Sequence, residues 1–451
     1  MIRLDQSLKK GTISMKSVAL FRSRWVGMAA VALVVLVTAG DAVRSEDWPQ
    51  WRGPKNNGIS NETNTPTKWS KTENVAWKLP MPGPAGATPV VWGERIFLTS
   101  VEKDSGDLLL LCVGTDGKEN WRQVLGSGNR ASRGDEGNSA SNSPSTDGTH
   151  VWAMMTTGVI GCWTVEGKEV WKFNLQDRYG KFNIQFGMTA SPVLDGERLF
   201  VQLIHGDGNA KTREAVVVAL DKTTGKEIWK RDRPSDAIQE NEHSYASPMI
   251  YDDGKTKFLL THGADFIVAH DLKDGRELWR CGNLNAKTKY DPTLRFVASP
   301  VTGNGIIVVP TAKGAPVVAI KPDGKGDITN NSATQLWRYN KTPDVPSPLI
   351  HEGLVYLCMA DGQVHLLDEK SGEQIYLKRA HNDRYRGSPV YADGKLYLTA
   401  RGGLVTVIKA GRDYEVLAEN DLGEPISASP AFANGTLYLR GFENLWAIKN
   451  K

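Results

Sequence analysis

A short pattern, Ser or Thr followed by Pro and then by an alternating apolar segment, recurs eight times along this chain of 451 residues. The prolines of the pattern are residues 89, 144, 192, 248, 300, 348, 389 and 430. Their intervals of 41 to 56 residues fit one four-stranded blade of a β-propeller with loops of variable length. A parallel β-solenoid is the alternative, but its repeats would be shorter and would lack four distinct strands. The repeat therefore predicts an all-β propeller of four-stranded antiparallel blades.

The end of each unit carries a second pattern, which is clearest from Asp221 through Gly225 to Trp229. An aspartate in a turn accepts backbone N–H groups, and a glycine adopts positive φ at no steric cost. The tryptophan is then predicted on the outermost strand, where a large ring fills the widening gap between blades. Further copies end at Trp121, Trp171, Trp279, Trp337 and, with a smaller ring, Tyr376; the seventh unit has lost the pattern near Val416.

Eight first strands are present, yet only seven units continue to a last strand. The eighth unit starts at Pro430, and its final apolar segment is residues 445–448. Residues 74–79 carry an outer-strand tryptophan, Trp77, before any first strand has appeared. Pairing this segment with the eighth unit removes two exposed sheet edges. We therefore expect residues 75–451 to form a closed eight-bladed β-propeller, preceded by an N-terminal extension at residues 46–74.

Residues 1–45 have the composition of a secretory signal peptide. Lys16, Arg22 and Arg24 precede an apolar run at residues 26–37, and small residues follow it. A membrane anchor is the alternative, but the run is shorter than the ~20 residues of a spanning helix, so cleavage is expected. Met15 is an alternative start, and no cysteine follows the run for lipid attachment. We expect a periplasmic or secreted protein that is not a lipoprotein and does not insert into the membrane after cleavage.

Without residues 1–45, the chain holds 48 lysines and arginines against 49 aspartates and glutamates. This near-neutral balance gives no electrostatic reason to expect nucleic acid or anionic lipid as a partner, and a monomer is expected. Four cysteines permit two disulfides. However, Cys112 and Cys162 occupy equivalent places in two repeats, which should lie beyond bridging distance. Buried free thiols are therefore expected at Cys112, Cys162, Cys281 and Cys358.

The run Ala-x-Asp-x-x-x-Gly-x-x-x-Trp, as at residues 219–229 and 269–279, resembles the pyrroloquinoline-quinone (PQQ)-type propeller repeat. That family includes quinoprotein alcohol dehydrogenases and BamB-like exported scaffold propellers, and the resemblance covers about residues 47–451. Residues 47–54 also resemble the start of exported proteins with PQQ-like repeats. For a dehydrogenase, the resemblance implies PQQ and calcium in the central funnel, beside two adjacent disulfide-linked cysteines. This chain has no adjacent cysteine pair, so no catalytic residue is carried over.

The loops before each Ser-Pro are expected to open onto the end of the central channel, which makes their polar residues candidate ligands. The funnel candidates are Glu242, His243, Arg295 and Arg386, of which Glu242 and His243 have the chemistry to bind a metal or move a proton. Other polar residues of these loops are Arg130, Asp135, Glu136, Asn142, Gln185, Asp291, Asp383 and Arg384. The alternative is that all these groups solvate the channel mouth and hydrogen-bond neighbouring blades.

Three functions are compatible with these features. The preferred one is a non-enzymatic scaffold that binds protein or carbohydrate on its loop face, with specificity in the insertions at residues 124–142, 177–186 and 321–335. The alternative is a quinoprotein oxidoreductase using PQQ and calcium, and the third is a sugar-binding or sugar-cleaving propeller. The turn at residues 323–327 falls short of a calcium-binding loop, so no metal site is expected. Residues 48–52 are expected to pack over the propeller's outer surface or, alternatively, to clamp a partner.

Overall fold

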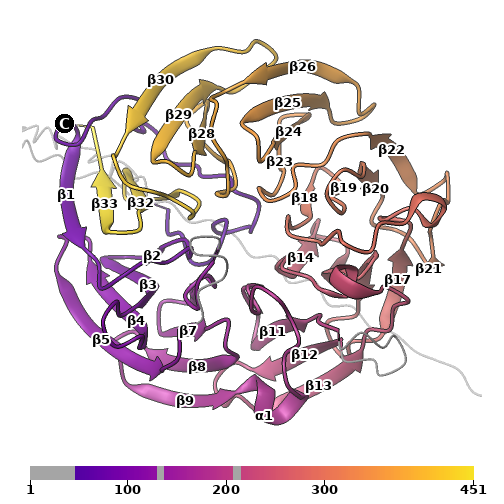
Figure 1. The fold of residues 1–451 in the computed structure, drawn as a ribbon, viewed down its shortest axis with the longest axis horizontal. Coiled ribbons are helices and arrows are strands. Elements are labelled where there is room, and N and C mark those ends of the chain that lie inside the picture. Colours follow the sequence, from indigo (N-terminus) through magenta and orange to yellow (C-terminus); the bar gives the residue numbers. More distant parts are fainter. Residues whose placement is uncertain (1–45, 130–136, 207–214, 451) are drawn as a thin grey trace, which may run out of the picture. The chain divides into compact units, whose positions relative to one another are not determined.

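The computed structural model describes residues 46–129, 137–206 and 215–450, which form eight β-sheets. The described residues belong to one compact unit. The predicted leader, residues 1–45, lies outside the described residues. The eight sheets stand around a central axis as the blades of a propeller (Figure 1). The prediction of an eight-bladed β-propeller is confirmed.

The strands of each blade follow one another outward from the axis. Blades 1 to 4 contain β2 (Val90–Trp92), β3 (Arg95–Val101), β4 (Leu108–Gly114) and β5 (Glu119–Gly126); β6 (Ser145–Thr146), β7 (His150–Met154), β8 (Val159–Thr164) and β9 (Glu169–Asn174); β10 (Val193–Asp195), β11 (Arg198–Leu203), β12 (Val216–Asp221) and β13 (Glu227–Asp232); β14 (Met249–Asp252), β15 (Lys257–Gly263), β16 (Phe266–His270) and β17 (Glu277–Cys281).

The other four blades repeat this order. Blades 5 to 8 contain β18 (Val301–Gly303), β19 (Ile306–Val309), β20 (Val317–Ile320) and β22 (Gln335–Tyr339); β23 (Leu349–His351), β24 (Leu354–Cys358), β25 (Gln363–Asp368) and β26 (Gln374–Arg379); β27 (Val390–Ala392), β28 (Lys395–Thr399), β29 (Leu404–Lys409) and β30 (Val416–Asp421); β31 (Ala431–Ala433), β32 (Thr436–Arg440), β33 (Asn444–Ile448) and β1 (Val75–Pro80).

The two faces of the ring carry different connections. On the side that we call the upper face, each outer strand connects to the inner strand of the next blade; one such connection holds the short helix α1 (Leu175–Tyr179) and others hold the 3-10 turns Gln239–Glu242 and Lys287–Lys289. The turns between the second and third strands of the blades, such as the one after β19, also lie on the upper face. The opposite, lower face carries the turns after the first and third strands, such as those after β10 and β12. The predicted channel loops therefore all belong to the upper face.

The Ser-Pro pattern is explained by a ring of hydrogen bonds around the axis. The backbone N–H of the Ser or Thr before each Pro donates to the hydroxyl oxygen of the equivalent residue in the next blade, at 2.8–3.0 Å. Seven such bonds link Thr88, Ser143, Ser191, Ser247, Ser299, Ser347, Ser388 and Ser429 in succession. A small residue with a hydroxyl acceptor is required because the blades approach most closely here.

The tryptophan pattern is explained by a contact between successive blades. The indole of each outer-strand Trp lies over the turn glycine of the next blade and donates its Nε1–H to a backbone carbonyl in that turn, at 2.7–3.1 Å. These six donors are Trp77, Trp121, Trp171, Trp229, Trp279 and Trp337. Between blades 7 and 8, where the pattern is lost, Trp69 of the extension is buried instead and stacks on Tyr397.

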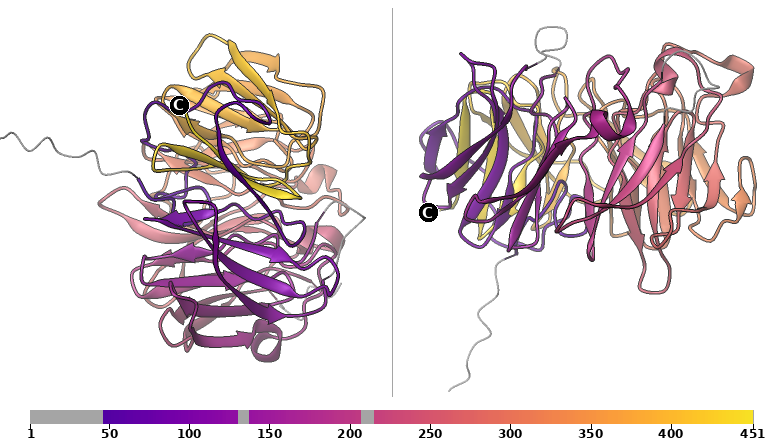
Figure 2. Two further views of the ribbon diagram at one scale, coloured as in Figure 1. Left: turned by 90° about the vertical axis from the view of Figure 1, so that its left-hand side faces the viewer. Right: turned by 90° about the horizontal axis from the view of Figure 1, so that it is seen from below.

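The last blade is built from both ends of the propeller. Strand β1 pairs antiparallel with β33, with Trp77 opposite Ala447, and completes the sheet of β31, β32 and β33. In Figure 1 the indigo strand β1 lies beside the yellow strand β33, and the side views of Figure 2 show the same neighbourhood. The predicted closure is confirmed. All four cysteines are buried and free, as expected. No helix among the described residues is long and apolar enough to cross a membrane.

Residues 46–60, which we call the strap, cross the lower face instead of the outer surface. Trp48 is fully buried and pairs with Val91 of the first inner strand, and Ser60 donates to the carbonyl of Tyr391 in blade 7. Between these contacts the buried Arg52 donates to the carbonyl oxygens of Asn57 and Pro348, and burial lowers its pKa to about 9. The prediction that residues 48–52 pack on the propeller is therefore correct, but their place on its outer surface is wrong.

A second correction concerns the insertion at residues 321–335. This segment joins β20 to β22 and therefore leaves from the lower face. Its residues Gly326–Asp327 form β21, which adds to β17 as a fifth, parallel strand on blade 4. The insertion caps the outer edge of a neighbouring blade, a position that protects the exposed backbone groups of an edge strand.

Candidate functional site

The channel along the axis is closed from below and open above. Trp51 of the strap lines its lower end together with the ring of Ser and Thr hydroxyls. The third residue before each repeat Pro lies one step above this ring, and all eight of these residues line the axial space: Gly86, Ser141, Thr189, Tyr245, Val297, Val345, Arg386 and Ser427. One repeated position therefore supplies the channel mouth with one residue from every blade, and these residues are of six types.

Above the ring the channel widens into two adjoining hollows, which we together call the upper cavity. The first has a volume of about 390 Å³ and has Phe186, Tyr245 and Phe442 in its wall. The second, of about 610 Å³, extends over blades 5 to 7. Arg295 and Arg386 belong to the walls of both hollows. Volumes of this size are typical of sites for small ligands or a few side chains.

Arg295 is held in place from two sides. Its guanidinium donates to the Glu240 carboxylate at 3.0 Å and lies 4.6 Å from the centre of the Phe186 ring. Phe186 in turn meets Tyr245 edge to face, with ring centres 5.8 Å apart. A guanidinium stacked on an aromatic face loses little conformational freedom when it binds, because its orientation is already fixed.

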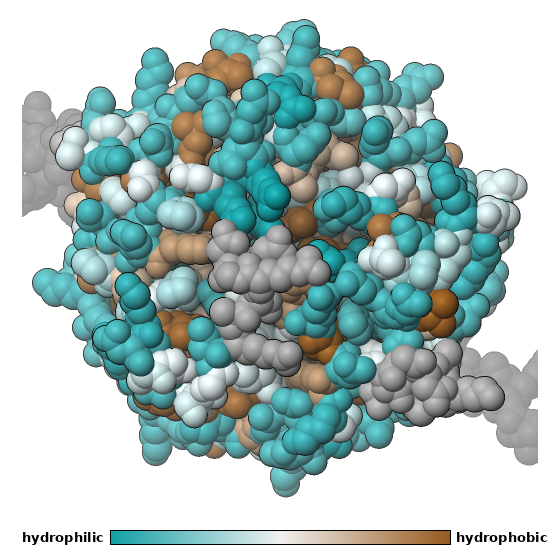
Figure 3. Space-filling model, in the orientation of Figure 1, coloured by the Kyte–Doolittle hydropathy of each residue, from teal (hydrophilic) through white to brown (hydrophobic). Residues whose placement is uncertain are grey.

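The charge of the upper cavity is mainly positive. Its described walls hold five cations, namely Arg295, Lys313, Lys341, Arg384 and Arg386, and two carboxylates, Asp344 and Asp361. Both carboxylates have a cation nearby: Asp344 lies 3.7 Å from Lys313, and Asp361 lies 3.8 Å from Arg379. Figure 3, which looks onto this face, shows a mostly hydrophilic surface with scattered hydrophobic residues. The cavity is therefore suited to an anionic ligand.

The four predicted funnel residues divide into two pairs. Arg295 and Arg386 line the upper cavity, whereas Glu242 and His243 are not among its wall residues. Glu242 is buried and packs against Gly206, where a Cβ atom would overlap its carboxylate. Burial lowers the pKa of His243, so the ring is neutral at neutral pH. His243 meets the ring of Tyr245, a wall residue, edge to face, with ring centres 6.5 Å apart.

The other predicted loop residues are also divided. Arg384 belongs to the cavity wall, whereas Asn142 is fully buried and donates to two carbonyls of the next connection. Asp291 binds Thr293 of its own turn, and Asp383 accepts from the backbone of Gly402. Gln185 is exposed. Arg130, Asp135 and Glu136 lie outside the described residues.

Sequence reasoning missed the aromatic part of the site. Phe186, Tyr245 and Phe442 line the upper cavity, and Asp344, which was also not predicted, adds a carboxylate. For Tyr245 a usable indicator exists, because it is one of the eight residues three positions before a repeat Pro. Phe186 and Phe442 come from connections whose length differs between blades. Their positions therefore have no equivalent in the other repeats.

The family model described as outer membrane protein assembly factor BamB matches residues 156–327 and, in a second alignment, residues 263–450. This chain belongs to that family. Membership agrees with the eight blades, the hydroxyl ring and the tryptophan contacts described above. The recognition of a PQQ-like repeat propeller from the sequence is thereby confirmed.

Solved structures and one curated relative show how the fold is shared. BamB from Moraxella catarrhalis superposes with a TM-score of 0.60 at 12% identity, covering 83% of this chain and 99% of that one. A quinohemoprotein alcohol dehydrogenase from Comamonas testosteroni gives 0.64 at 15% identity, covering 91% and 82%. The polyvinylalcohol dehydrogenase of a Pseudomonas species is 23% identical over 317 residues, 56% of this chain. The match covers 46% of that relative, so this chain spans about half of its length.

The residues present do not fit the quinone and calcium centre that the dehydrogenase resemblance implies. Within the described ranges, no three His, Cys, Asp or Glu side chains stand close enough together to hold a metal ion. The cavity carboxylates Asp344 and Asp361 each lie beside a cation instead. The cysteines lie on strands β4, β8, β17 and β24 of different blades, away from the axial walls. We therefore derive no reaction through PQQ at this site.

Proposed function

We propose that this protein is an exported, non-enzymatic binding scaffold whose upper cavity takes an acidic segment of a partner protein. The observation that carries the proposal is the excess of cations around the channel mouth, with Arg295 oriented by Glu240 and Phe186. Residues 1–45 serve as the cleaved signal peptide in this proposal, and the propeller acts as a monomer in the periplasm or outside the cell.

The chemistry of the wall indicates what the segment contains. Guanidinium groups bind carboxylates through two parallel hydrogen bonds, which favours Asp, Glu or a chain terminus. The rings of Phe186, Tyr245 and Phe442 add an apolar surface for a neighbouring aromatic or aliphatic side chain. A rigid ring of blades holds both elements in place, so the segment binds without a large rearrangement of the propeller.

We expect Arg386→Glu to weaken binding of an acidic probe by about tenfold or more, because it replaces attraction at the cavity wall by repulsion. The probe is a fluorescein-labelled peptide of alternating glutamate and phenylalanine, measured by fluorescence anisotropy. Its affinity for the unaltered protein is expected to fall as salt is raised, because screening weakens exposed charge pairs.

The control is Arg231→Glu, which makes the same charge change on the exposed outer strand β13. It should leave the affinity within about twofold. Equal weakening by both variants would attribute binding to net charge alone. Equal affinity for a peptide with lysine in place of glutamate would also contradict the proposal.

The alternative function, a quinoprotein oxidoreductase, is favoured by the likeness to the polyvinylalcohol dehydrogenase. Calorimetry and absorbance with PQQ and Ca²⁺ separate the two functions. We expect neither heat nor a spectral change at high quinone concentration, because the described cavity walls offer cations where a calcium site needs clustered oxygen ligands. Tight binding at one site that requires Ca²⁺ would overturn the scaffold and make dye-linked oxidation of alcohols the next test.

A further inference from the structure

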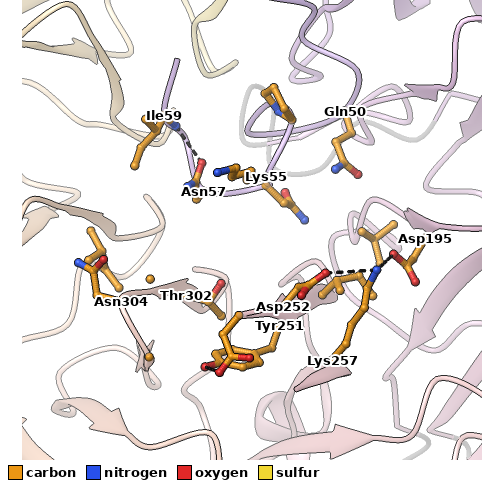
Figure 4. Close-up of a pocket in the computed structure, with 18 of the residues that line it drawn as sticks. Gln50, Lys55, Asn57, Ile59, Asp195, Tyr251, Asp252, Lys257, Thr302 and Asn304 are labelled. Carbon is orange, nitrogen blue, oxygen red and sulfur yellow. Dashed lines mark hydrogen bonds and ion pairs between the residues drawn. The ribbon is translucent and has the colours of Figure 1, made fainter. Parts of the chain in front are cut away.

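The lower face holds a second cavity. The strap contacts blade 1 through Trp48, blade 2 through Pro49 and blade 7 through Ser60. Its Arg52 also reaches the carbonyl of Pro348 in blade 6, but the strap does not fill the space beside the inner strands of blades 3 to 6. Between the strap and these four blades lies a space of about 720 Å³, which we call the lower cavity. Figure 4 shows Gln50, Lys55 and Asn57 on the strap side of this space and Thr302 and Lys257 on the blade side.

Four of the charged groups that line the lower cavity, Lys257, Asp195, Asp252 and Asp253, already have partners, whereas Lys55 and Glu352 lie at its wall as exposed charges. Lys257 bridges Asp195 of blade 3 and Asp252 of blade 4, at 2.5 and 3.4 Å, and these contacts raise the pKa of the lysine. Asp253 accepts from the Tyr251 hydroxyl at 3.0 Å and from the backbone of its own turn. No carboxylate pair is therefore left to hold a cation, and the acidic groups disfavour an anion.

Two buried polar atoms of the wall have no hydrogen-bond partner within the propeller. The side-chain oxygen of Asn56, in a residue that is 7% exposed, accepts nothing. Nε2 of His351 also makes no hydrogen bond, although the Glu352 carboxylate lies 3.8 Å from it. Burial lowers the pKa of this ring, whose centre lies 3.7 Å from that of the tilted Tyr391 ring. A buried polar atom without a partner costs free energy, so each of these atoms stabilises a ligand that reaches it with a hydrogen-bonding group.

The remaining wall combines amides with small apolar patches. Gln50 and Asn57 contribute amides from the strap, and Asn304 and Thr302 contribute an amide and a hydroxyl from blade 5. Asn57 already accepts from the backbone of Ile59, and Asn304 already donates to Glu369. Leu194, Ile250 and Ile350 occupy the same position, two residues after the repeat Pro, in three of the four blades, and present aliphatic groups to the cavity. A ligand that matches both kinds of surface is neutral, carries many hydroxyls and exposes C–H groups.

We propose that the lower cavity binds a neutral oligosaccharide. The volume suits a chain of several sugar rings better than a single ring. The Asp195 and Asp252 carboxylates, fixed by Lys257, act as acceptors for sugar hydroxyls, and the amides of the strap act from the opposite side. This site lies on the opposite face from the upper cavity, so the proposal does not depend on the function proposed above.

The test is calorimetry of the purified protein with cellohexaose, xylohexaose, maltohexaose and chitohexaose. We expect at least one to bind at submillimolar concentration. Thr302→Trp should weaken that binding by about tenfold or more, because an indole fills the space between strap and blades. Gln50→Ala, which removes one side-chain amide from the strap side of the cavity, should weaken it by about fivefold.

Two controls keep these outcomes distinct. Val124→Trp adds the same ring at an exposed site on the outer strand β5, and Arg386→Glu alters the upper cavity; both should bind the sugar as the unaltered protein does. The proposal is overturned if none of the four oligosaccharides binds, or if binding survives Thr302→Trp and Gln50→Ala. Loss of sugar binding with Arg386→Glu alone would place the sugar in the upper cavity and equally overturn it.

Discussion

Replacing Glu424 by alanine is expected to lower the free energy of unfolding by about 3–5 kcal/mol. Glu424 is 4% exposed and lies in the connection from blade 7 to blade 8. One carboxylate oxygen accepts the backbone N–H groups of Glu443 and Asn444, at 2.6 and 3.0 Å. The other accepts from the side chains of Asn444 and Trp446, at 2.8 and 2.6 Å. The alanine variant leaves several of these buried donors without an acceptor.

The position of Glu424 makes this loss larger than a local one. Its four donors precede or belong to β33, the strand that pairs with β1 to close the ring. Loosening β33 therefore weakens the pairing of both chain ends. Denaturant unfolding followed by tryptophan fluorescence measures the change.

The matched comparisons are Glu424→Gln and Glu415→Ala. Glutamine keeps one oxygen acceptor of the same reach, so its loss should lie between those of alanine and the unaltered chain. Glu415 is exposed and lies 3.9 Å from Lys409, so Glu415→Ala should change stability by less than about 0.5 kcal/mol. A loss of under about 1 kcal/mol for Glu424→Ala would contradict the role given to this carboxylate.

The fold was predictable because each blade repeats the same physical contact. Ser before Pro is needed as an acceptor in seven successive blade contacts, and Trp229 and its equivalents meet a turn glycine in six. Eight occurrences of the Ser/Thr-Pro pattern give the number of blades. Trp77, which precedes the first of them, identifies the strand that closes the ring. Repetition thus converts a weak local pattern into a strong prediction.

Features that occur once were not predictable in the same way. The strap has no repeated counterpart, so nothing in the sequence shows that Arg52 reaches the carbonyl of Pro348, nearly three hundred residues away. The parallel strand Gly326–Asp327 is also unique, and its two residues have no alternating pattern. Tertiary contacts alone decide where such segments lie.

The candidate site was predictable in its position and only partly in its composition. Arg295 and Arg386 were identified because they precede a repeat Pro, which fixes the upper mouth of the channel as their location. Glu242 and His243 satisfy the same rule but are not among the wall residues of the cavity, and Glu242, in the 3-10 turn Gln239–Glu242, packs against Gly206 instead. The number of residues between a side chain and the repeat Pro indicates how far above the hydroxyl ring it lies. The local turn decides whether that side chain reaches the cavity.

Replacing Gly275 by alanine is expected to lower the free energy of unfolding by about 2–4 kcal/mol, the second large effect. Gly275 has a φ of +75°, and a Cβ atom placed there would lie 2.5 Å from Cε3 of Trp229. Two costs therefore combine: about 1 kcal/mol for an L-residue at positive φ, and a further cost of about 1–3 kcal/mol for displacing a packed indole. Trp229 would also lose its hydrogen bond to Leu272.

Gly196→Ala separates the two costs, because Gly196 has a φ of +56° with no heavy atom within 4 Å of the added Cβ. It should lose only about 1 kcal/mol. A double-mutant cycle sharpens the comparison: in a Trp229→Ala background the ring is gone, so Gly275→Ala should again cost only about 1 kcal/mol. Equal losses for Gly275→Ala and Gly196→Ala would mean that the glycine of the repeat serves its turn alone. A larger loss at Gly275 that disappears without Trp229 identifies the contact between blades as the reason that glycine and tryptophan recur together.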